Sequence, residues 1–169
     1  TESQEICFVP DDDYTRFLEE NYSDKVSPPG PIFDTAGSKL GEHKGLHHYT
    51  IGQRRGLGIS LSYPVYVVEM DRSQNALIIG KEKEVYNKGL FAENVNWISV
   101  SELEERREVS AKIRYNAPAV TAVIYPETAT DRIKVIFEEE QRAVTPGQSV
   151  VFYEEDTVLG GGIIESGFK

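Results

Sequence analysis

The stretch AVTPGQSVVFYEEDTVLGGGII, residues 143–164, contains two short runs of strand-forming residues. Residues 150–153 and 158–164 are rich in valine, isoleucine, tyrosine and phenylalanine, which favour β-structure. The Thr145-Pro146-Gly147-Gln148 sequence in front of them has the composition of a tight turn. We therefore predict two strands here, with a turn at the entrance of the first.

Runs of the same kind continue upstream through most of the chain. They lie at residues 65–70, 76–79, 90–100, 109–115, 120–125 and 133–137. Turn residues separate neighbouring runs, as at residues 71–75 and 126–131, and a further turn is expected at the glycines 160–162. Several short strands at this spacing predict a closed or nearly closed antiparallel barrel.

The part of the chain before the barrel has a different pattern. Residues 11–22 predict a short helix, because aspartates can cap its start and apolar side chains follow at helical spacing. The proline-rich residues 27–31 end that helix, and seven glycines between residues 30 and 58 favour hairpins and loops. A further helical turn is expected at residues 101–107, where glutamates follow a serine. The predicted fold class is mainly β: a small mixed α/β central domain followed by an antiparallel β-barrel.

Composition excludes several classes of protein. Hydrophobic residues make up 39% of the 169 residues, which is enough for a core and excludes a fully disordered chain. No apolar run reaches the roughly 20 residues of a membrane helix, and the first residues have no signal-peptide character. The single cysteine, Cys7, excludes an intrachain disulfide framework and predicts a reducing, cytoplasmic location. The only methionine is Met70, so nothing marks residue 1 as a translation start. The chain is either the C-terminal part of something longer or a protein that has lost its initiating methionine.

Charge is distributed unevenly along the chain. The net charge of −10 by itself argues against a nucleic-acid-binding protein. However, residues 43–68 and 110–126 contain no acidic residue, and the first of these windows holds two arginines, a lysine and all three histidines. An anion-binding surface built from the two windows is one interpretation, and chance clustering of solvated charges is the other.

Both windows contain candidate contacts for a nucleic acid. The sequence HKGLHHYTIGQRRGLG of residues 43–58 combines accessible glycine amides with cations that suit phosphate oxygens, whereas an ordinary hairpin with exposed arginines is the alternative. Arg114 and Tyr115 offer a cation beside a ring on which a base can stack, although a plain strand end would look the same. Gln148 can hydrogen-bond a base or a sugar, or simply serve the turn.

Cys7 has two open interpretations. It is either a small buried apolar residue or a reactive thiol, and no neighbouring lysine or arginine marks it as a thiolate. A cysteine–histidine hydrolase would need a histidine and a third orienting residue, which nothing near Cys7 supplies. Cys7 could also join His43 and His47 at a metal ion, but Gly45 disfavours a helix between the histidines and no carboxylate with ligand spacing follows. We predict no metal site.

Three longer blocks make a family resemblance specific. They are SQEICFV at residues 3–9, GEHKGLHHYTIGQRRGLGI at residues 41–59 and the block at residues 143–164 quoted above. With these blocks the chain resembles, over essentially its whole length, the C-terminal portion of the tRNA-specific 2-thiouridylases, which replace O2 of the wobble uridine by sulfur. Members of this family begin with an ATP-binding domain that carries an SGG-x-DS motif. This sequence lacks the motif, so ATP is expected to bind a missing N-terminal domain and no cofactor is expected here.

The resemblance implies a division of the chain into three parts. Residues 1–9 correspond to the catalytic-cysteine loop from the end of the missing nucleotide-binding domain. Residues 10–87 correspond to a central tRNA-binding domain, and residues 88–169 to a C-terminal β-barrel domain.

The resemblance also implies roles for single residues. Cys7 is expected to receive sulfur as a persulfide from a sulfur-relay protein or a cysteine desulfurase, and to transfer it to C2 of a uridine that ATP has activated. It is then expected to form a transient disulfide with a cysteine of the missing domain. Contacts with tRNA are expected at Arg114, Tyr115 and Gln148, whereas Asn116 departs from the arginine that many members have there. Further candidate contacts with tRNA, from the cationic segment described above, are His43, Lys44, Gln53, Arg54 and Arg55.

The full-length protein is therefore expected to be a tRNA-uridine 2-sulfurtransferase, and this chain alone to be inactive. The alternative is a non-catalytic β-barrel module of the translation-factor kind that binds RNA or protein, in which Cys7 only packs. An upstream ATP-binding motif and a second cysteine would discriminate between the two.

Overall fold

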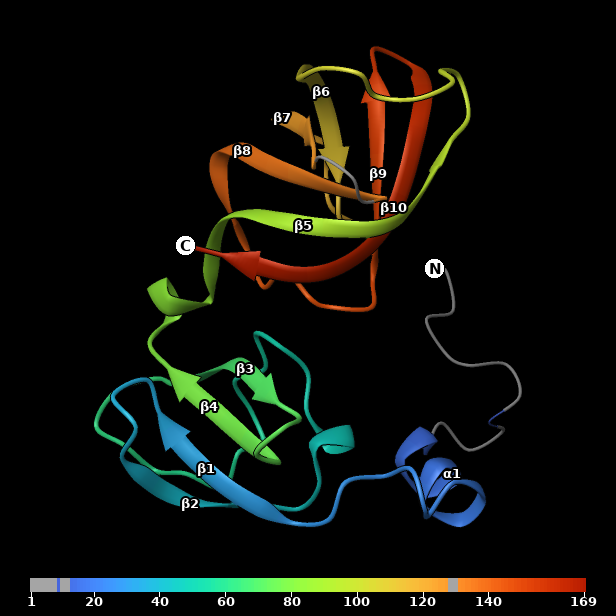
Figure 1. Cartoon of the computed structure of the whole chain (residues 1–169). Coiled ribbons are helices and arrows are strands. Elements are labelled where there is room, and N and C mark those ends of the chain that lie inside the picture. The colour runs from blue at the N-terminus through green and yellow to red at the C-terminus, as the bar shows by residue number, and fades with distance from the viewer. Residues whose placement is uncertain (1–8, 10–12, 128–130) are drawn as a thin grey trace. The chain divides into compact units, whose positions relative to one another are not determined.

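The computed structural model describes residue 9, residues 13–127 and residues 131–169 of the chain (Figure 1). The chain divides into two compact units between Glu82 and Lys83. The predicted domain limits at residues 9 and 87 stay predictions. Within the described ranges, no helix has the length and the apolar character that crossing a membrane requires.

The first unit is a mixed sheet with one α-helix. It consists of α1 (Tyr14–Asn21), β1 (Gly30–Asp34), β2 (Lys39–His43), the 3-10 helix η1 (Leu46–His48), β3 (Tyr66–Asp71) and β4 (Ala76–Gly80). The strand order is β2-β1-β4-β3, in which β1 and β4 run parallel and the other two pairs run antiparallel. The predicted mixed α/β character of this part of the chain is thereby confirmed.

A hydrophobic cluster joins the sheet of the first unit to the segments outside it. Ile32, Leu77 and Ile79 of β1 and β4 are fully buried, and they pack with Val67 of β3. The members of the cluster from outside the sheet are Leu46, Tyr49, Leu57 and Val65. The glycine-rich segment is thus anchored by its few apolar side chains, and its polar side chains are left for other roles.

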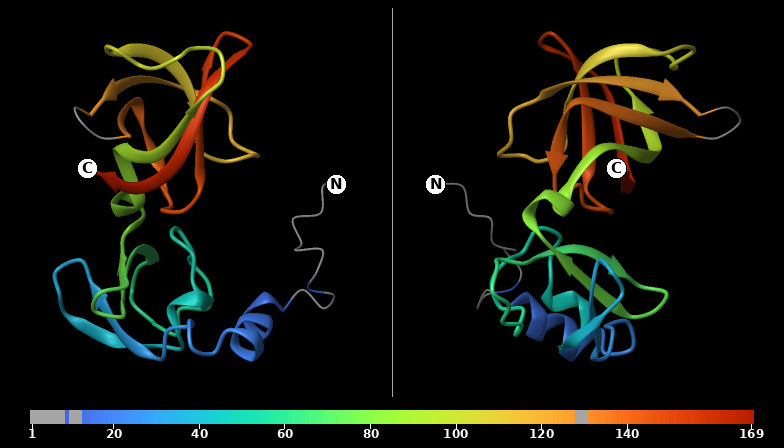
Figure 2. Two further views of the ribbon diagram at one scale, coloured as in Figure 1. Left: turned by 45° about the vertical axis from the view of Figure 1, so that its right-hand side comes forward. Right: turned by 90° about the vertical axis from the view of Figure 1, so that its left-hand side faces the viewer.

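The second unit is a closed barrel of six antiparallel strands (Figures 1 and 2). The 3-10 helix η2 (Glu82–Val85) leads into β5 (Tyr86–Trp97), β6 (Arg107–Lys112), β7 (Val120–Pro126), β8 (Arg132–Arg142), β9 (Ser149–Glu154) and β10 (Thr157–Phe168). The order around the barrel is β10-β5-β8-β7-β6-β9, and pairing of β9 with β10 closes it. The predicted antiparallel barrel is confirmed.

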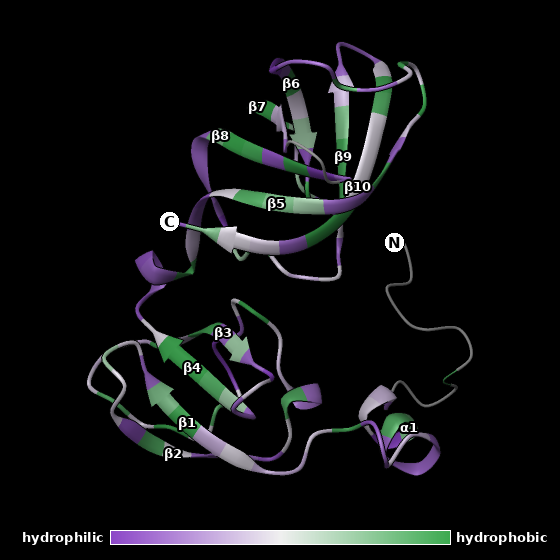
Figure 3. Ribbon diagram, in the orientation of Figure 1, coloured by the Kyte–Doolittle hydropathy of each residue, from purple (hydrophilic) through white to green (hydrophobic). Residues whose placement is uncertain are grey.

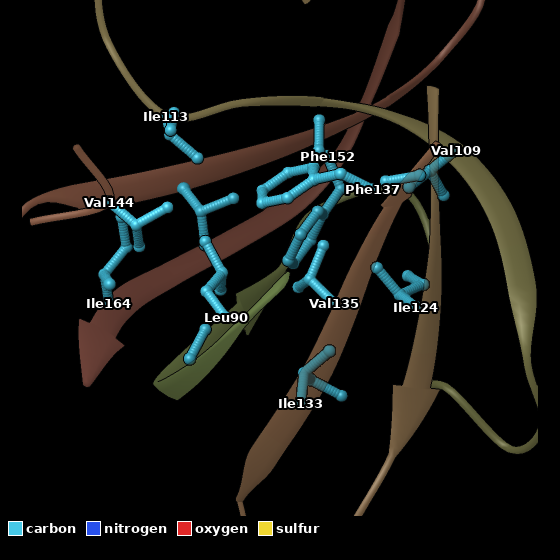
Figure 4. Packing of buried hydrophobic residues seen from close by; sticks show 14 of the residues in the cluster. Leu90, Val109, Ile113, Ile124, Ile133, Val135, Phe137, Val144, Phe152 and Ile164 are labelled. Atoms are coloured by element: carbon cyan, nitrogen blue, oxygen red, sulfur yellow. The ribbon is translucent and has the colours of Figure 1, made fainter. Parts of the chain in front are cut away.

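Alternation of side chains along the strands fills the barrel. On β8, Ile133, Val135 and Phe137 are buried, while the residues between them are partly exposed. Figure 4 shows these side chains gathered with Phe152 of β9 and Leu90 of β5 in one cluster. In Figure 3 the apolar colour accordingly lies mainly on strands such as β4 and β9, and connecting segments are largely hydrophilic.

Two predictions around β6 are wrong. Residues 101–106 form no helix but an irregular loop, in which Leu103 packs against the barrel core, and Arg107 already begins β6. A single helical turn has too few hydrogen bonds to persist against that packing. β6 ends at Lys112 instead of continuing to residue 115, so Arg114 and Tyr115 lie in the following loop.

The glycines 160–162 are also placed differently from the prediction. They lie inside β10 and do not form a turn. A Cβ atom on Gly160 would lie only 2.5 Å from the carbonyl oxygen of Asn96 on β5. Glycine is therefore needed here for close approach of neighbouring strands, and not for chain reversal.

Candidate nucleic-acid interface

One end of the barrel gathers the two loops that contain the predicted tRNA contacts. β6 ends at Lys112, which pairs with Val151 near the start of β9 in an antiparallel ladder. The loop that follows β6 and the loop that precedes β9 therefore lie at the same end of the barrel. We call this end, formed by residues 112–119 and 142–148, the basic rim.

Arg114 joins the two loops of the basic rim. Its Nη2 group donates hydrogen bonds to the carbonyl oxygen of Arg142, at 2.7 Å, and to that of Ala143. The Ala143 carbonyl also accepts a hydrogen bond of 3.0 Å from the Thr145 hydroxyl. Ala143 has a φ of 53°, a left-handed conformation that is uncommon for a residue with a side chain. These contacts hold the second loop in a conformation that its sequence does not prefer.

Gln148 ends a tight turn in the second loop. Its N–H donates to the carbonyl of Thr145 at 3.3 Å, Pro146 occupies the second position and Gly147 has a φ of 85°, which together make a turn of type II. The turn is fastened to β10, because the Gly147 N–H donates to the Ile164 carbonyl at 2.8 Å and the Ile164 N–H donates to the Gln148 carbonyl at 2.7 Å. The predicted turn is confirmed, and the Gln148 side chain is exposed.

Tyr115 is a largely solvent-exposed aromatic residue of the basic rim. The residue is 73% exposed, and Nζ of Lys112 lies 5.6 Å from the centre of its ring. A flat exposed ring beside a cation suits stacking on an unpaired nucleobase while the ammonium group meets a phosphate. The next residue, Asn116, is exposed and uncharged.

The surroundings of Arg114 favour a bound anion. Partial burial and, to a smaller extent, the positive charge of Arg142 lower the pKa of the Arg114 guanidinium from its ordinary value. Both effects disfavour the charged form of the Arg114 guanidinium. A phosphate bound beside Arg114 and Arg142 would stabilise that charged form and so reduce this cost. Because Nη2 is engaged with backbone carbonyls, Nε and Nη1 are the groups with which Arg114 can meet such an anion.

The opposite end of the barrel is acidic. The connections β5–β6 and β9–β10 contain the exposed residues Glu102, Glu104, Glu105, Glu155 and Asp156. All neighbouring strands of the barrel are antiparallel, and in this order strands that follow one another in the sequence run in opposite directions. Successive connections therefore alternate between the two ends, which separates this acidic cluster from the acid-free loops. Three further exposed glutamates, residues 138–140, lie on β8 two to four residues before Arg142, toward the basic rim.

In the first unit, His43 is an internal residue of the cationic segment 43–58. It is only 1% exposed. Its Nδ1 accepts a hydrogen bond of 3.1 Å from the Gly45 N–H, so the ring proton is on Nε2, which lies 2.9 Å from the carbonyl oxygen of Asn75. Both ring nitrogens are therefore engaged inside the protein, and His43 fixes the start of the segment against the turn before β4.

Gln53 has a similar internal role in the same segment. Its Oε1 accepts a hydrogen bond of 2.9 Å from the Thr50 N–H, and its Nε2 donates one of 2.8 Å to the Arg55 carbonyl. The Val67 N–H donates to the Gln53 carbonyl at 2.9 Å, which attaches the segment to β3. Lys44, Arg54 and Arg55 are exposed, so the cationic segment offers these three cations on a braced backbone.

Cys7 lies outside the described residues. Nucleotide phosphates are commonly held by a glycine-rich loop at the N-terminus of a helix. The helix that follows Gly45 in this chain is η1, a 3-10 helix of only three residues. No SGG-x-DS motif occurs in the 169 residues either, so these residues do not fit ATP.

Sequence reasoning missed part of the basic rim. The carbonyl groups of Arg142 and Ala143 accept the hydrogen bonds that bring its two loops together, and the Thr145 hydroxyl adds a bond within the second loop. Only Arg142 carries a signal, as a cation directly before the quoted block, whereas an alanine that supplies a backbone carbonyl cannot be recognised from its residue type.

Two family models match the chain. Residues 15–81 match a tRNA methyl transferase PRC-barrel domain, and residues 87–164 match an aminomethyltransferase beta-barrel domain. The tRNA-specific 2-thiouridylase of Halothermothrix orenii is 64% identical over 167 residues, which are 99% of this chain and 46% of that relative. Proteins of the same name from Acetivibrio thermocellus and Natranaerobius thermophilus are 55% and 50% identical, over 97% and 96% of this chain and 45% and 44% of their own lengths.

The chain thus spans a little under half the length of these relatives. The two models follow one another along it with few residues unmatched between them. Matched by both models and by these relatives along nearly all of its residues, the chain belongs to the family of the tRNA-specific 2-thiouridylases.

Proposed function

We propose that this chain holds tRNA and carries sulfur in the thiolation of a uridine at C2, as part of a tRNA-uridine 2-sulfurtransferase. The name that its relatives share supports the reaction and the substrate. The charge distribution of the described residues supports the binding of a polyanion at two places, the basic rim and the cationic segment. We further propose that the reaction takes place in the cytoplasm.

The contact between the two loops of the basic rim carries the proposal. Through Arg114 and the Ala143 carbonyl, the exposed Tyr115 and the turn of Gln148 come to one end of the barrel. A stacking ring, a guanidinium and an amide side chain are thus all supplied by the two loops at this end. Single-stranded RNA is recognised with this combination, because unstacked bases offer both a face and a polar edge while phosphates offer charge.

The cationic segment supplies the second contact region of the proposal. Lys44, Arg54 and Arg55 bind phosphates, while His43 and Gln53 act as positioning residues that keep the backbone of the segment in place. This division follows from burial: the first three side chains are exposed and the last two are engaged with backbone groups.

Cys7 is the sulfur carrier of the proposal. A cysteine desulfurase or a sulfur-relay protein loads its thiolate as a persulfide, whose terminal sulfur bonds to C2 of the uridine while the activated O2 departs. A second cysteine thiolate then attacks Sγ of Cys7, which breaks the S–S bond, leaves the transferred sulfur on the base and forms a disulfide that an external thiol must reduce. ATP supplies the activation of O2, and since the present residues do not fit ATP, the chain alone is inactive.

Tyr115→Ala tests the tRNA half of the proposal. We expect the variant to bind a tRNA that has a wobble uridine roughly 5- to 150-fold more weakly in fluorescence anisotropy, because base stacking on an aromatic ring contributes about 1–3 kcal/mol. Arg114→Lys keeps the positive charge but loses the guanidinium group that donates to the Arg142 and Ala143 carbonyls. We therefore expect this variant to bind tRNA more weakly as well. Arg106→Ala, an exposed arginine at the acidic end, and Cys7→Ser are controls that bind normally.

Two results would overturn parts of this proposal. Unchanged binding by Tyr115→Ala, or an equal loss in Arg106→Ala, would remove the basic rim from the interface. Sulfur loading of Cys7 is tested by mass spectrometry of the intact chain after incubation with a cysteine desulfurase and cysteine, which detects the added mass of a sulfur atom. A chain that binds tRNA but gains no sulfur atom would be a non-catalytic RNA-binding module.

A further inference from the structure

Three side chains with metal-binding groups meet in the first unit, two of them within the cationic segment 43–58. Glu19 lies on α1, and His47 and His48 lie on η1, which is beside α1 in both views of Figure 2. Oε1 of Glu19 is 3.2 Å from Nε2 of His47 and 3.1 Å from Nε2 of His48. The three ligand atoms all lie within 4.8 Å of one another.

The two distances from Glu19, 3.2 and 3.1 Å, match those between ligand atoms around a tetrahedral metal ion. Ligand atoms bound about 2.05 Å from a zinc ion at tetrahedral angles are about 3.3 Å apart. Two imidazoles and one carboxylate form a set that zinc accepts, with water in the fourth position. His47 and His48 differ from the histidine pair singled out in the sequence, because the nitrogens of His43 are both engaged with backbone groups.

The surroundings of the three groups also favour an ion. The His47 side chain is only 11% exposed, and its Nδ1 is buried with no hydrogen-bond partner among the described residues. No backbone group therefore fixes this ring, whose orientation depends on what meets Nε2. The side chains of His48 and Glu19 are 28% and 49% exposed, so an ion has a route from solvent.

The attachment of α1 gives such an ion a role. The helix has only eight residues and none of them is buried. A helix of this length is not stable by itself, and a polar contact with the rest of the unit, from the Tyr14 hydroxyl to the His47 carbonyl, is long at 3.5 Å. A shared ion at Glu19 would fasten α1 to η1.

We propose that Glu19, His47 and His48 bind one zinc-class divalent metal ion, which clamps α1 onto η1. The proposed role of the ion is to hold these two elements together, and it is independent of the proposed sulfur transfer. Because η1 opens the segment that continues to Arg54 and Arg55, the clamp also steadies the beginning of that segment.

The test is titration of the full chain, freed of any histidine tag and of bound metal, with Zn²⁺ by calorimetry and with Co²⁺ by visible absorption. We expect one ion per chain, and a Co²⁺ spectrum typical of tetrahedral nitrogen and oxygen ligands. Glu19→Gln and His48→Ala should each weaken binding at least about 10-fold, since each removes one of three ligands. Paramagnetic Co²⁺ should broaden the amide NMR signals of α1 and η1 before others.

Matched variants make the result decisive. Glu20→Gln changes the neighbouring glutamate, which pairs with Arg16 at 3.6 Å, and should bind the ion normally. Cys7→Ser should also bind normally, because the thiol is not one of the three ligands. The proposal is overturned if neither ion binds, if Glu19→Gln and His48→Ala leave binding unchanged, or if Cys7→Ser abolishes it.

Discussion

His43 occupies a position in which one imidazole satisfies two backbone groups, the N–H of Gly45 and the carbonyl of Asn75. Gly30 packs against the same place: a Cβ atom there would lie 2.8 Å from Nε2 of His43 and 2.2 Å from the Asn75 oxygen. Glycine is therefore required for this close approach, and histidine for the hydrogen bonds. The pair determines how β1 and β2 meet the turn before β4.

The residue-scale prediction is that His43→Phe lowers the stability of the first unit. The ring volume is nearly kept, but two backbone groups lose their partner, at about 1–3 kcal/mol each. We expect the free energy of unfolding reported by amide hydrogen exchange in β2 and β4 to fall by about 2–4 kcal/mol.

Lys44→Ala is the matched control for this change. Its side chain is exposed, so its stability should stay within about 0.5 kcal/mol of the parent while its affinity for tRNA falls. If His43→Phe instead lowered tRNA affinity and left exchange in β2 and β4 unaltered, His43 would be a contact residue and not a positioning residue.

At the scale of elements, α1 depends on its N-cap as much as on packing. Oδ1 of Asp13 accepts hydrogen bonds from the Arg16 N–H at 3.0 Å and from the Thr15 hydroxyl at 2.7 Å. The bond from the Arg16 N–H first, and then that from Thr15, lower the pKa of Asp13 from its ordinary value of 3.8. The carboxylate form is thus the one that caps the helix.

The element-scale prediction follows from the sign of that pKa shift. A carboxyl whose pKa is lower in the folded state stabilises the fold at all pH values above its ordinary pKa, and this stabilisation disappears as the pH falls through the lowered value. We expect the α1 amide chemical shifts to move toward random-coil values as the pH falls below about 4. Asparagine also caps a helix but does not titrate, so Asp13→Asn should not show this acid-induced change in the α1 chemical shifts. If the parent and the variant respond identically to acid, Asp13 is not the cause of the change.

At the scale of the whole molecule, a net charge of −10 coexists with two stretches of sequence, residues 43–68 and 110–126, that contain no acidic residue. In the barrel, alternation of the connections sends the acid-free loops to one end and Glu102, Glu104 and Glu105 to the other. In the first unit, burial of the apolar residues of the cationic segment leaves its cations at the surface. Local potential, and not net charge, then governs where a polyanion can bind.

The whole-molecule prediction concerns salt. If the two surfaces contact phosphates, the logarithm of the tRNA association constant should fall steeply and linearly with the logarithm of salt concentration. Lys44→Ala and Arg54→Ala should each reduce the slope by about 0.7–0.9, which is the effect of losing one phosphate contact. Arg72→Ala, an exposed arginine in the turn between β3 and β4, should leave the slope unchanged although it changes the net charge equally. A flat salt response, or an equal effect of Arg72→Ala, would remove the cationic segment from the interface.

Much of the fold could be predicted because its signals are local. The run at residues 120–125 became β7, Val120–Pro126, and the Thr145-Pro146-Gly147-Gln148 sequence became a type II turn. Prediction failed where neighbours in space prevailed over local pattern. Leu103 packs into the barrel instead of joining a helix, and Gly160 lies in a strand because Asn96 leaves no room for a Cβ atom.

The sequence by itself determined the strands, the barrel and the residue types available for binding, because alternation, turn chemistry and charge windows depend on residues close together in the chain. Only the tertiary structure decided which of those residues work together. Arg114 meets the carbonyl oxygens of Arg142 and Ala143, which are 28 and 29 residues away, and Glu19 meets His47 at a separation of 28 residues. No local pattern encodes such pairs, since they exist only when packing of the two cores brings distant segments to the same place.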